Sequence, residues 1–298
     1  GAHISVKRSY GPSIPCININ PKIYTMKKII VPVDFSEQSE IALKTAASIA
    51  NKYKSDIYVL HMLELSEALI SVNEQVHYEQ AVFMIKLAEK RFAEFLDKPY
   101  LKGINVTPIV KHHKVFSEVN AIVEKHNADL IVMGSHGTDG IKEIFIGSNA
   151  EKMVRNANVP VLVIKDEIPG FEVQRFIFAC DFKEENLEAF QRAKVLADKL
   201  DAEMILVYVN TPGDNFLSTT DAFKRINKFL HLAKASLEVE IFNDYSVEQG
   251  IISFGESRNA DLIGMPTHGR KGLTHFLMGS IGEDVANHSK IPVITFKI

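Results

Sequence analysis

Two patterns of apolar and polar positions alternate along the chain from Met26 onward, one typical of buried strands and one with helical periodicity. A short apolar run at 28–34 has the continuous character of a buried strand. The next apolar positions recur with the period of a helix, and they are Ile41, Ala42, Thr45, Ala46 and Ile49. Ser36, just before them, is the expected N-cap. This succession of strand and helix predicts an α/β fold built on a parallel sheet.

The same two patterns continue to the end of the chain. In the first half we expect strands at 28–34, 56–62, 104–111, 129–133 and 161–165, with helices at 36–54, 72–97, 117–127 and 148–156. In the second half we expect strands at 175–181, 203–209, 236–242, 261–265 and 292–297, with helices at 184–200, 220–233, 247–258 and 280–288. Right-handed crossovers between parallel strands would place helices on both faces of each sheet.

The two halves are copies of each other. The strand that ends at Asp34 resembles the strand that ends at Asp181, which lies 181 − 34 = 147 residues later. The strand that ends at Met133 resembles the strand that ends at Met265, which lies 265 − 133 = 132 residues later. The second copy has therefore lost 147 − 132 = 15 residues between its second and fourth strands. Matched segments in one order indicate a tandem duplication of a domain. We expect domains at 26–167 and 168–298, each a doubly wound, five-stranded parallel sheet of order 3-2-1-4-5.

Composition narrows the class of protein. The chain has 298 residues with 46% hydrophobic and 24% charged residues, as in ordinary soluble globular proteins, and a net charge of -3. Such a charge indicates neither a nucleic-acid surface nor an anionic-membrane surface, and no apolar run has the length of a membrane span. Its two cysteines, Cys16 and Cys180, form no disulfide framework or metal spacing, which fits a reducing cytoplasm.

Residues 1–25 stand apart from this pattern. They contain Pro12, Pro15 and Pro21, show no sustained periodicity and lack the continuous apolar stretch of a signal peptide. We interpret them as an N-terminal arm outside the fold, and we expect part of the arm to be added sequence or the result of a misplaced start site.

The segment 129–148 carries the candidate chemistry. An apolar run ends at Met133, Gly134-Ser-His-Gly137 follows, and after nine further residues Gly147-Ser148 opens a helical pattern. A strand, a glycine-rich loop and a helix N-terminus together form an anion site, since glycines admit a close ligand and free N–H groups point at negative charge. The loop lacks the Gly-Lys-Ser or Gly-Lys-Thr end of a P-loop and the spacing of a dinucleotide fold. The alternative is a βα turn that needs glycine for geometry alone.

The spacing Gly-x-x-Gly, nine residues, Gly-Ser resembles the nucleotide loop of the universal stress protein family. The resemblance extends to Pro32-Val33-Asp34 at the end of the first strand and to the second strand at 57–62, where His61 precedes Met62. It covers nearly everything from Met26 onward, as a tandem of two such domains.

The resemblance implies a site for ATP or another adenine nucleotide in the first copy. It does not decide whether Mg²⁺ is bound together with the nucleotide. Its residues would be Pro32, Val33, Asp34, Met62, Met133, Gly134, His136, Gly137, Gly147, Ser148 and Asn149. By this likeness, Asp34 faces the base and ribose, the backbone at Val33 and Met62 receives adenine, and the loop wraps the ribose and phosphates.

Four of these residues also have a plainer interpretation. Asp34 is equally well explained as a helix cap or a turn carboxylate, although a carboxylate there can also accept from an amine or ribose hydroxyls. His136 is explained by simple exposure, Ser148 by a helix N-cap, and Met62 by a place in the core.

The second copy departs from the family pattern. Pro266 stands where the first copy has Gly134, and proline has no N–H to offer a phosphate. Arg270 and Lys271 add positive charge nearby, so binding in this copy stays open. The residues of this second candidate site are Asp181, Val209, Gly269, Gly279 and Ser280.

The sequence therefore favours a cytoplasmic stress-response protein that binds an adenine nucleotide mainly through its first domain. One alternative is an interaction module that binds no nucleotide, and another is a slow ATPase or phosphotransferase. Fast phosphoryl transfer needs metal ligands and cationic clamps, and the first copy offers only Lys142 and Asp34. No catalytic residues are expected, and His112-His113 lacks partners at metal-ligand spacing.

The last strand of each copy is apolar, and in the order 3-2-1-4-5 it would lie at a sheet edge. An exposed apolar edge invites pairing. The resemblance implies that two domains meet through these strands about a two-fold axis. We expect 161–164 and 293–296 to pair within one chain, because the linked partner is present at high effective concentration. The alternative is a homodimer in which two chains exchange the contact. No nucleic-acid or membrane partner is expected.

Overall fold

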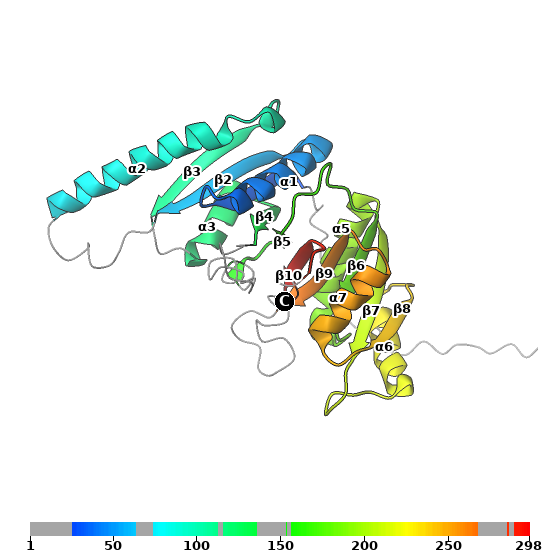
Figure 1. The fold of residues 1–298 in the computed structure, drawn as a ribbon. Helices are drawn as coiled ribbons and strands as arrows, with labels where there is room; N and C mark the ends of the chain where they lie inside the picture. Colours follow the sequence, from blue (N-terminus) through cyan, green and yellow to red (C-terminus); the bar gives the residue numbers. More distant parts are fainter. Residues whose placement is uncertain are drawn as a thin grey trace, which may run out of the picture.

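The computed structural model describes residues 26–63, 74–112, 116–135, 153, 156–267, 285 and 289–298. The strands of the first repeat are β1 (Lys28–Val33), β2 (Asp56–Leu63), β3 (Val106–His112), β4 (Leu130–Gly134) and β5 (Val161–Ile164). Those of the second repeat are β6 (Arg175–Ala179), β7 (Glu203–Asn210), β8 (Val239–Asn243), β9 (Leu262–Thr267) and β10 (Val293–Lys297). Within the described residues they form one ten-stranded sheet of order β3-β2-β1-β4-β5-β10-β9-β6-β7-β8 (Figure 1).

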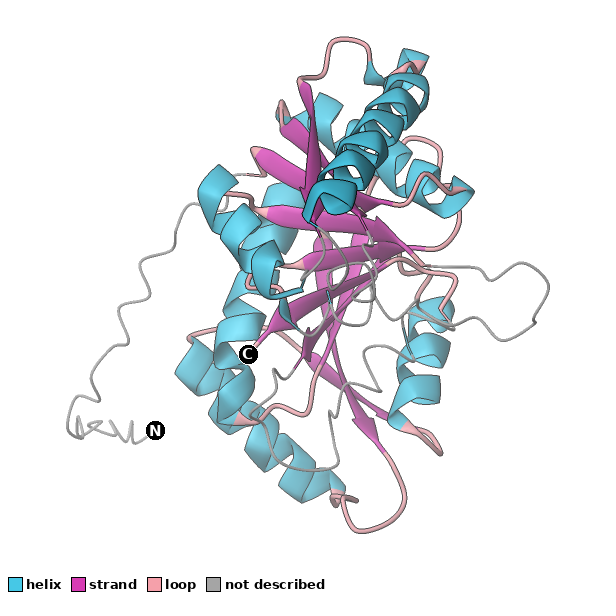
Figure 2. Ribbon diagram, turned by 90° about the vertical axis from the view of Figure 1, so that its left-hand side faces the viewer, coloured by secondary structure: helices cyan, strands magenta, loops and turns pink. Residues whose placement is uncertain are grey.

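Helices cover both faces of this sheet (Figure 2). The helices of the first repeat are α1 (Glu37–Tyr53), α2 (Glu74–Leu96), the 3-10 turn η2 (Pro99–Leu101) and α3 (Phe116–His126). Those of the second repeat are the 3-10 turn η3 (Glu184–Asn186), α5 (Leu187–Leu200), α6 (Thr219–Ala233) and α7 (Val247–Ser257). No helix in this part of the chain is long and apolar enough to cross a membrane.

Each half of the sheet has the order 3-2-1-4-5, and all strand pairs within a half are parallel. The predicted fold class is therefore confirmed. Much of the length difference between the repeats lies in one helix, since α2 has 23 residues and its counterpart α6 has 15. The predicted helices 148–156 and 280–288 lie almost wholly outside the described residues.

Alternation along the strands builds one core on each face of the sheet. On β1, Ile29 and Val31 pack toward α1 and α2, whereas Ile30 packs toward α3. Both cores contain residues of both repeats, so the hydrophobic interior continues across the middle of the sheet. Strands buried on both faces explain the continuous apolar runs seen in the sequence.

The start of the first helix differs between the repeats. Ser36 is the predicted N-cap of α1, and its hydroxyl accepts from the backbone N–H of Ser39 at 3.2 Å. The matching position of the second repeat holds Lys183, whose side chain has no acceptor and makes no cap. The predicted helix 184–200 is wrong in this detail, because the chain first forms η3 and the α-helix begins at Leu187.

The two halves of the sheet meet through β5 and β10, which pair antiparallel. The register is Val163↔Val293, Leu162↔Ile294 and Val161↔Thr295. Leu162 and Ile294 are equivalent residues of the two repeats (294 − 162 = 132), so a pseudo-two-fold axis passes through this pair. The expected pairing of the last strands within one chain is confirmed.

The first turn of α1 lies against the carboxyl end of β4. A Cβ atom on Gly134 would stand 2.4 Å from the carbonyl oxygen of Gln38. With its amide oriented to donate, the Gln38 side chain also bonds the carbonyls of Ser135 and Lys165, each at 3.1 Å. Close approach of the helix backbone is therefore sufficient to require glycine at residue 134, whatever this residue does toward a ligand.

Val163→Asp should separate the two repeats. Val163 is 3% exposed and pairs with Val293 in the β5–β10 seam, and an unpaired carboxylate there costs several kcal/mol. We expect a larger radius of gyration in solution scattering with retained far-UV circular dichroism. Thr107→Asp, on the exposed side of edge strand β3, is the matched control and should change neither quantity. A wild-type radius in a folded Val163→Asp variant would show that the strands do not hold the halves together.

Gly134→Ala should lower the free energy of unfolding by about 1–3 kcal/mol, because the obstructing atom belongs to backbone and moves only with the helix. Urea denaturation of the free protein measures the change. Wild-type stability would mean that α1 retreats from β4 without cost. A proline at residue 134 would meet the same obstruction, so loss of binding in such a variant would not by itself identify a ligand contact.

Candidate functional site

Six residues of the first predicted site gather at one edge of the sheet. Pro32 and Val33 end β1 and Asp34 follows them, Met62 lies in β2, and Met133 and Gly134 end β4. β1 and β4 are parallel neighbours at the point where the strand order reverses. Open α/β sheets bind ligands in the crevice outside such carboxyl ends. The other five, which are His136, Gly137, Gly147, Ser148 and Asn149, lie outside the described residues.

Asp34 builds the turn between β1 and α1. Its Oδ1 accepts hydrogen bonds from the Ser39 hydroxyl at 2.6 Å and the Ser36 N–H at 3.0 Å, and the Asp34 N–H donates back to the Ser39 hydroxyl at 3.0 Å. Phe35, between them, has a positive φ of 66°. Asp34 is exposed to solvent, so this turn holds its carboxylate at the surface beside the carboxyl ends of β1 and β4.

His61 is a neighbour of the site that sequence reasoning did not place in it. Its Nδ1 lies 2.9 Å from the carbonyl oxygen of Val33, and because a carbonyl only accepts, this nitrogen carries the proton. The imidazole also packs on Phe35, with ring centroids 4.5 Å apart, and Arg91 of α2 lies 5.9 Å from the Phe35 ring. The position of His61 opposite Val33 in the β1–β2 register is the signal that would have found it.

The two methionines of the first predicted site, Met62 and Met133, differ in how deeply they are buried. Met133 is 5% exposed and belongs to the core under α3, whereas Met62 is only partly buried. At Met133 and Gly134, therefore, any ligand contact would come from the backbone.

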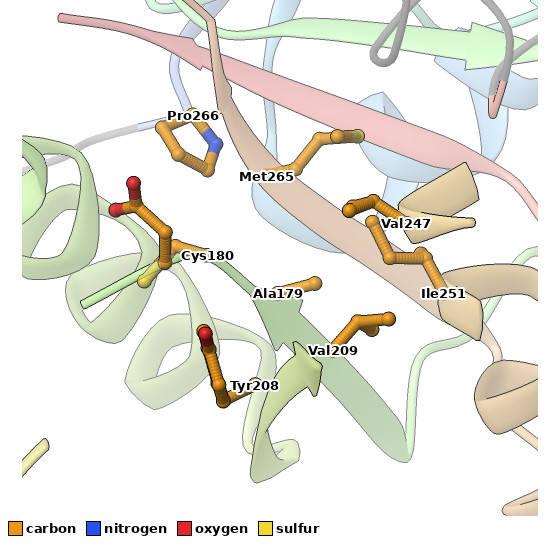
Figure 3. Close-up of a pocket in the computed structure, with 9 residues that line it drawn as sticks. Ala179, Cys180, Tyr208, Val209, Val247, Ile251, Met265 and Pro266 are labelled. Carbon is orange, nitrogen blue, oxygen red and sulfur yellow. The ribbon is translucent and has the colours of Figure 1, made fainter. Parts of the chain in front are cut away.

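A pocket opens at the corresponding edge of the second repeat (Figure 3). Its walls come from the ends of β6, β7 and β9 and from α7, and they are formed by Ala179, Cys180, Asp181, Tyr208, Val209, Val247, Ile251, Met265 and Pro266. Two residues predicted for this site, Asp181 and Val209, are thus brought together, while Gly269, Gly279 and Ser280 lie outside the described residues. Sequence reasoning missed Val247 and Ile251, which one turn of α7 places on the same face.

Asp181 is buried, whereas Asp34 is exposed. It is 4% exposed, and its Oδ1 accepts from the Asn186 amide at 2.6 Å and the Lys183 N–H at 3.1 Å. Its Oδ2 pairs with the Lys183 ammonium at 2.9 Å. Both carboxylate oxygens are therefore engaged within the protein, which leaves less capacity to accept from a ligand.

The remainder of the pocket is mostly apolar. Burial raises the pKa of the Cys180 thiol and of the Tyr208 phenol, so both are protonated at neutral pH. Pro266 lies on β9 at the position that Gly134 has on β4, and it offers no N–H. No cluster of three or more metal-ligating side chains occurs in the described ranges of either repeat.

The sequence model of the universal stress protein family matches residues 25–165 and again residues 172–297. One universal stress protein of Methanocaldococcus jannaschii is 32% identical over 153 residues, which cover 47% of this chain and 94% of the relative. One from Synechocystis is 23% identical over 294 residues and covers 91% of this chain and 100% of its own.

The fold also resembles that of a solved protein. A universal stress protein from Archaeoglobus fulgidus superposes with a TM-score of 0.63 at 23% identity, over 92% of this chain and 97% of its own, which supports the fold. Another universal stress protein, solved in complex with cAMP, matches 41% of this chain and 96% of its own at 20% identity, with a TM-score of 0.32. Two consecutive family matches, on two sheets of the same strand order, place the chain in the universal stress protein family as a tandem of two such domains.

Proposed function

We propose that the first repeat binds an adenine nucleotide, ATP or AMP, at the carboxyl ends of β1, β2 and β4, and that the chain acts in the stress response of the cytoplasm. The domains would be 26–167 and 168–298. One observation carries this proposal: Asp34 and the end of β4, where the Gly-Ser-His-Gly sequence begins, lie at the carboxyl ends of neighbouring parallel strands where the strand order reverses.

The chemistry of this edge suits a nucleoside. Asp34 accepts two hydrogen bonds on Oδ1 in its turn, and the residue is exposed to solvent beside the strand ends. A carboxylate is an acceptor suited to ribose hydroxyls or to the amino group of adenine. The Val33 carbonyl accepts from His61 and retains a second lone pair.

Family membership adds support, because another member has been solved in complex with cAMP, an adenine nucleotide. The described residues hold no carboxylate cluster for a divalent cation. We therefore propose that any Mg²⁺ arrives on the phosphates of the nucleotide, as this ion commonly does.

The second repeat is proposed to bind more weakly. Asp181 is engaged on both oxygens by Lys183 and Asn186, and Pro266 lacks the N–H that a glycine would offer. These two differences act in the same direction, toward one tightly bound nucleotide per chain.

Asp34→Asn tests the role of the carboxylate. The amide oxygen can keep the bonds from Ser36 and Ser39, while the amide nitrogen replaces an acceptor with a donor. We expect the affinity for ATP or AMP in calorimetry to fall about tenfold or more. Asp181→Asn, at the matching position, is the control and should leave the tight site intact. An unchanged affinity in Asp34→Asn would remove Asp34 from the site.

Mass spectrometry of nucleotide released from the denatured protein, with calorimetry, should give fewer than two tightly bound nucleotides per chain. Gly147→Val should abolish tight binding because a side chain would occupy the space a phosphate needs. Gly279→Val, its counterpart, should leave the tight site intact. If Gly147→Val keeps the stoichiometry while Gly279→Val empties the protein, the assignment of the tight site to the first repeat is wrong.

A further inference from the structure

The N-terminal half of α2 carries apolar side chains that belong to neither core. The helix packs into the core that it shares with α1 through Phe92, Phe95 and Leu96, which all lie near its C-terminal end. Tyr78 and Phe83, in the other half, are 72% and 65% exposed. Figure 1 shows this half of α2 extending past the carboxyl end of β3. Large apolar side chains that gather on an exposed element indicate an interaction surface.

The second repeat has no such extension. Its counterpart helix, α6, buries Ala222, Ile226 and Phe229 at helical spacing, so a single apolar stripe covers most of its length. α6 has 15 residues and α2 has 23, a difference of 23 − 15 = 8. Since the shorter helix is sufficient to cover its half of the sheet, the additional residues of α2 require another explanation than the core.

The solvent face of α2 has an ordered pattern of charges around an apolar centre. Glu79, Val82, Phe83, Lys86 and Lys90 follow one another at i, i+3, i+4, i+7 and i+11, which places them on one side of the helix. Val82 is partly buried and the other four are exposed. The acidic residue lies toward the N-terminus and the basic residues toward the C-terminus. Seven residues of helix rise about 10 Å, so Glu79 and Lys86 of one helix are too far apart to pair with each other.

This pattern is complementary to itself. If two α2 helices pack antiparallel about a two-fold axis between Val82 and Phe83, each residue n faces residue 165 − n of the other helix, because 82 + 83 = 165. Val82 then meets Phe83 of the second copy, and Glu79 meets Lys86. The axis repeats each contact, which gives two apolar contacts and two ion pairs. Parallel helices would instead set Glu79 against Glu79 and Lys86 against Lys86, and like charges repel.

We propose that this face of α2 is an interface between two copies of the chain, packed antiparallel. It is a different surface from the edge of β5, which pairs with β10 inside one chain. A single pair of helices buries less area than a standard interface, so the dimer is reversible, with a dissociation constant of about 1–100 µM. The inference does not depend on nucleotide binding, and a failure of the proposed function leaves it unchanged.

Sedimentation velocity of the full chain between about 1 and 500 µM tests the proposal, since this range spans the expected dissociation constant. The sedimentation coefficient of the wild type should rise from that of a monomer to that of a dimer. Phe83→Glu should remain a monomer throughout, because it places a carboxylate in the apolar centre. Its melting temperature should change by no more than about 2 °C, since Phe83 is mostly exposed. Phe223→Glu, at an exposed phenylalanine of α6, is the matched control and should dimerise as the wild type does.

Exchanging the charges tests the antiparallel arrangement. Glu79→Lys alone, or Lys86→Glu alone, should weaken the dimer about tenfold, because both ion pairs become repulsive contacts. The double variant should return to within about threefold of the wild-type dissociation constant, since opposite charges face each other again. A parallel dimer contains no contact between Glu79 and Lys86, so its single charge variants would bind as tightly as the wild type.

Four results would overturn the inference. The first is a wild type that stays monomeric at every concentration, including the case in which another segment of the same chain covers this face. The second is a Phe83→Glu variant that dimerises with the wild-type dissociation constant. Single charge variants of unchanged affinity would exclude the antiparallel arrangement, and so would a double variant that dimerises no better than the single ones.

Discussion

The antiparallel pairing of β5 with β10 is the contact on which the arrangement of the whole sheet depends. All four residues of β5 are buried, and without its partner this strand would expose apolar side chains and unpaired backbone groups. Strands within each repeat are parallel, so the antiparallel seam turns the carboxyl ends of the two repeats toward opposite edges of the sheet. The carboxyl ends of β1 and β4 therefore lie at the edge of the sheet opposite to those of β6 and β9.

The same turn follows the first strand of each repeat, but its aspartate is exposed in the first repeat and buried in the second. Asp34 and Asp181 both follow the first strand of a repeat, precede a phenylalanine of positive φ and accept from a residue five positions later. In the first repeat the residue at this turn is exposed to solvent. In the second, Lys183 pairs with the carboxylate, which is buried. The fold fixes where the acid lies, and the residue two positions later decides whether its charge is neutralised within the turn.

Local and periodic features were predictable from the sequence, whereas contacts between distant segments were not. The strands, the Ser36 cap, the duplication and the seam follow from spacing, capping chemistry and apolar edges. The late start of α5 and the reason for glycine at residue 134 depend on how closely segments distant in the sequence approach each other. The spacing of residues along the sequence does not give these distances. The same holds for the buried hydroxyls of Ser135 and Thr267, which have no hydrogen-bond partner in the part of the chain that the structure describes, since spacing does not show which polar atoms are left unpaired.

The pseudo-two-fold axis through Leu162 and Ile294 has a consequence for how such a protein can evolve. Two identical chains that meet about a true axis must carry the same residue at both sites, so any substitution acts twice. Joining the halves in one chain removes that condition. Equivalent positions of the two repeats accordingly hold different residues, as with Ser36 and Lys183 or with Gly134 and Pro266. The tandem thus keeps the geometry of a symmetric dimer while each half is free to specialise.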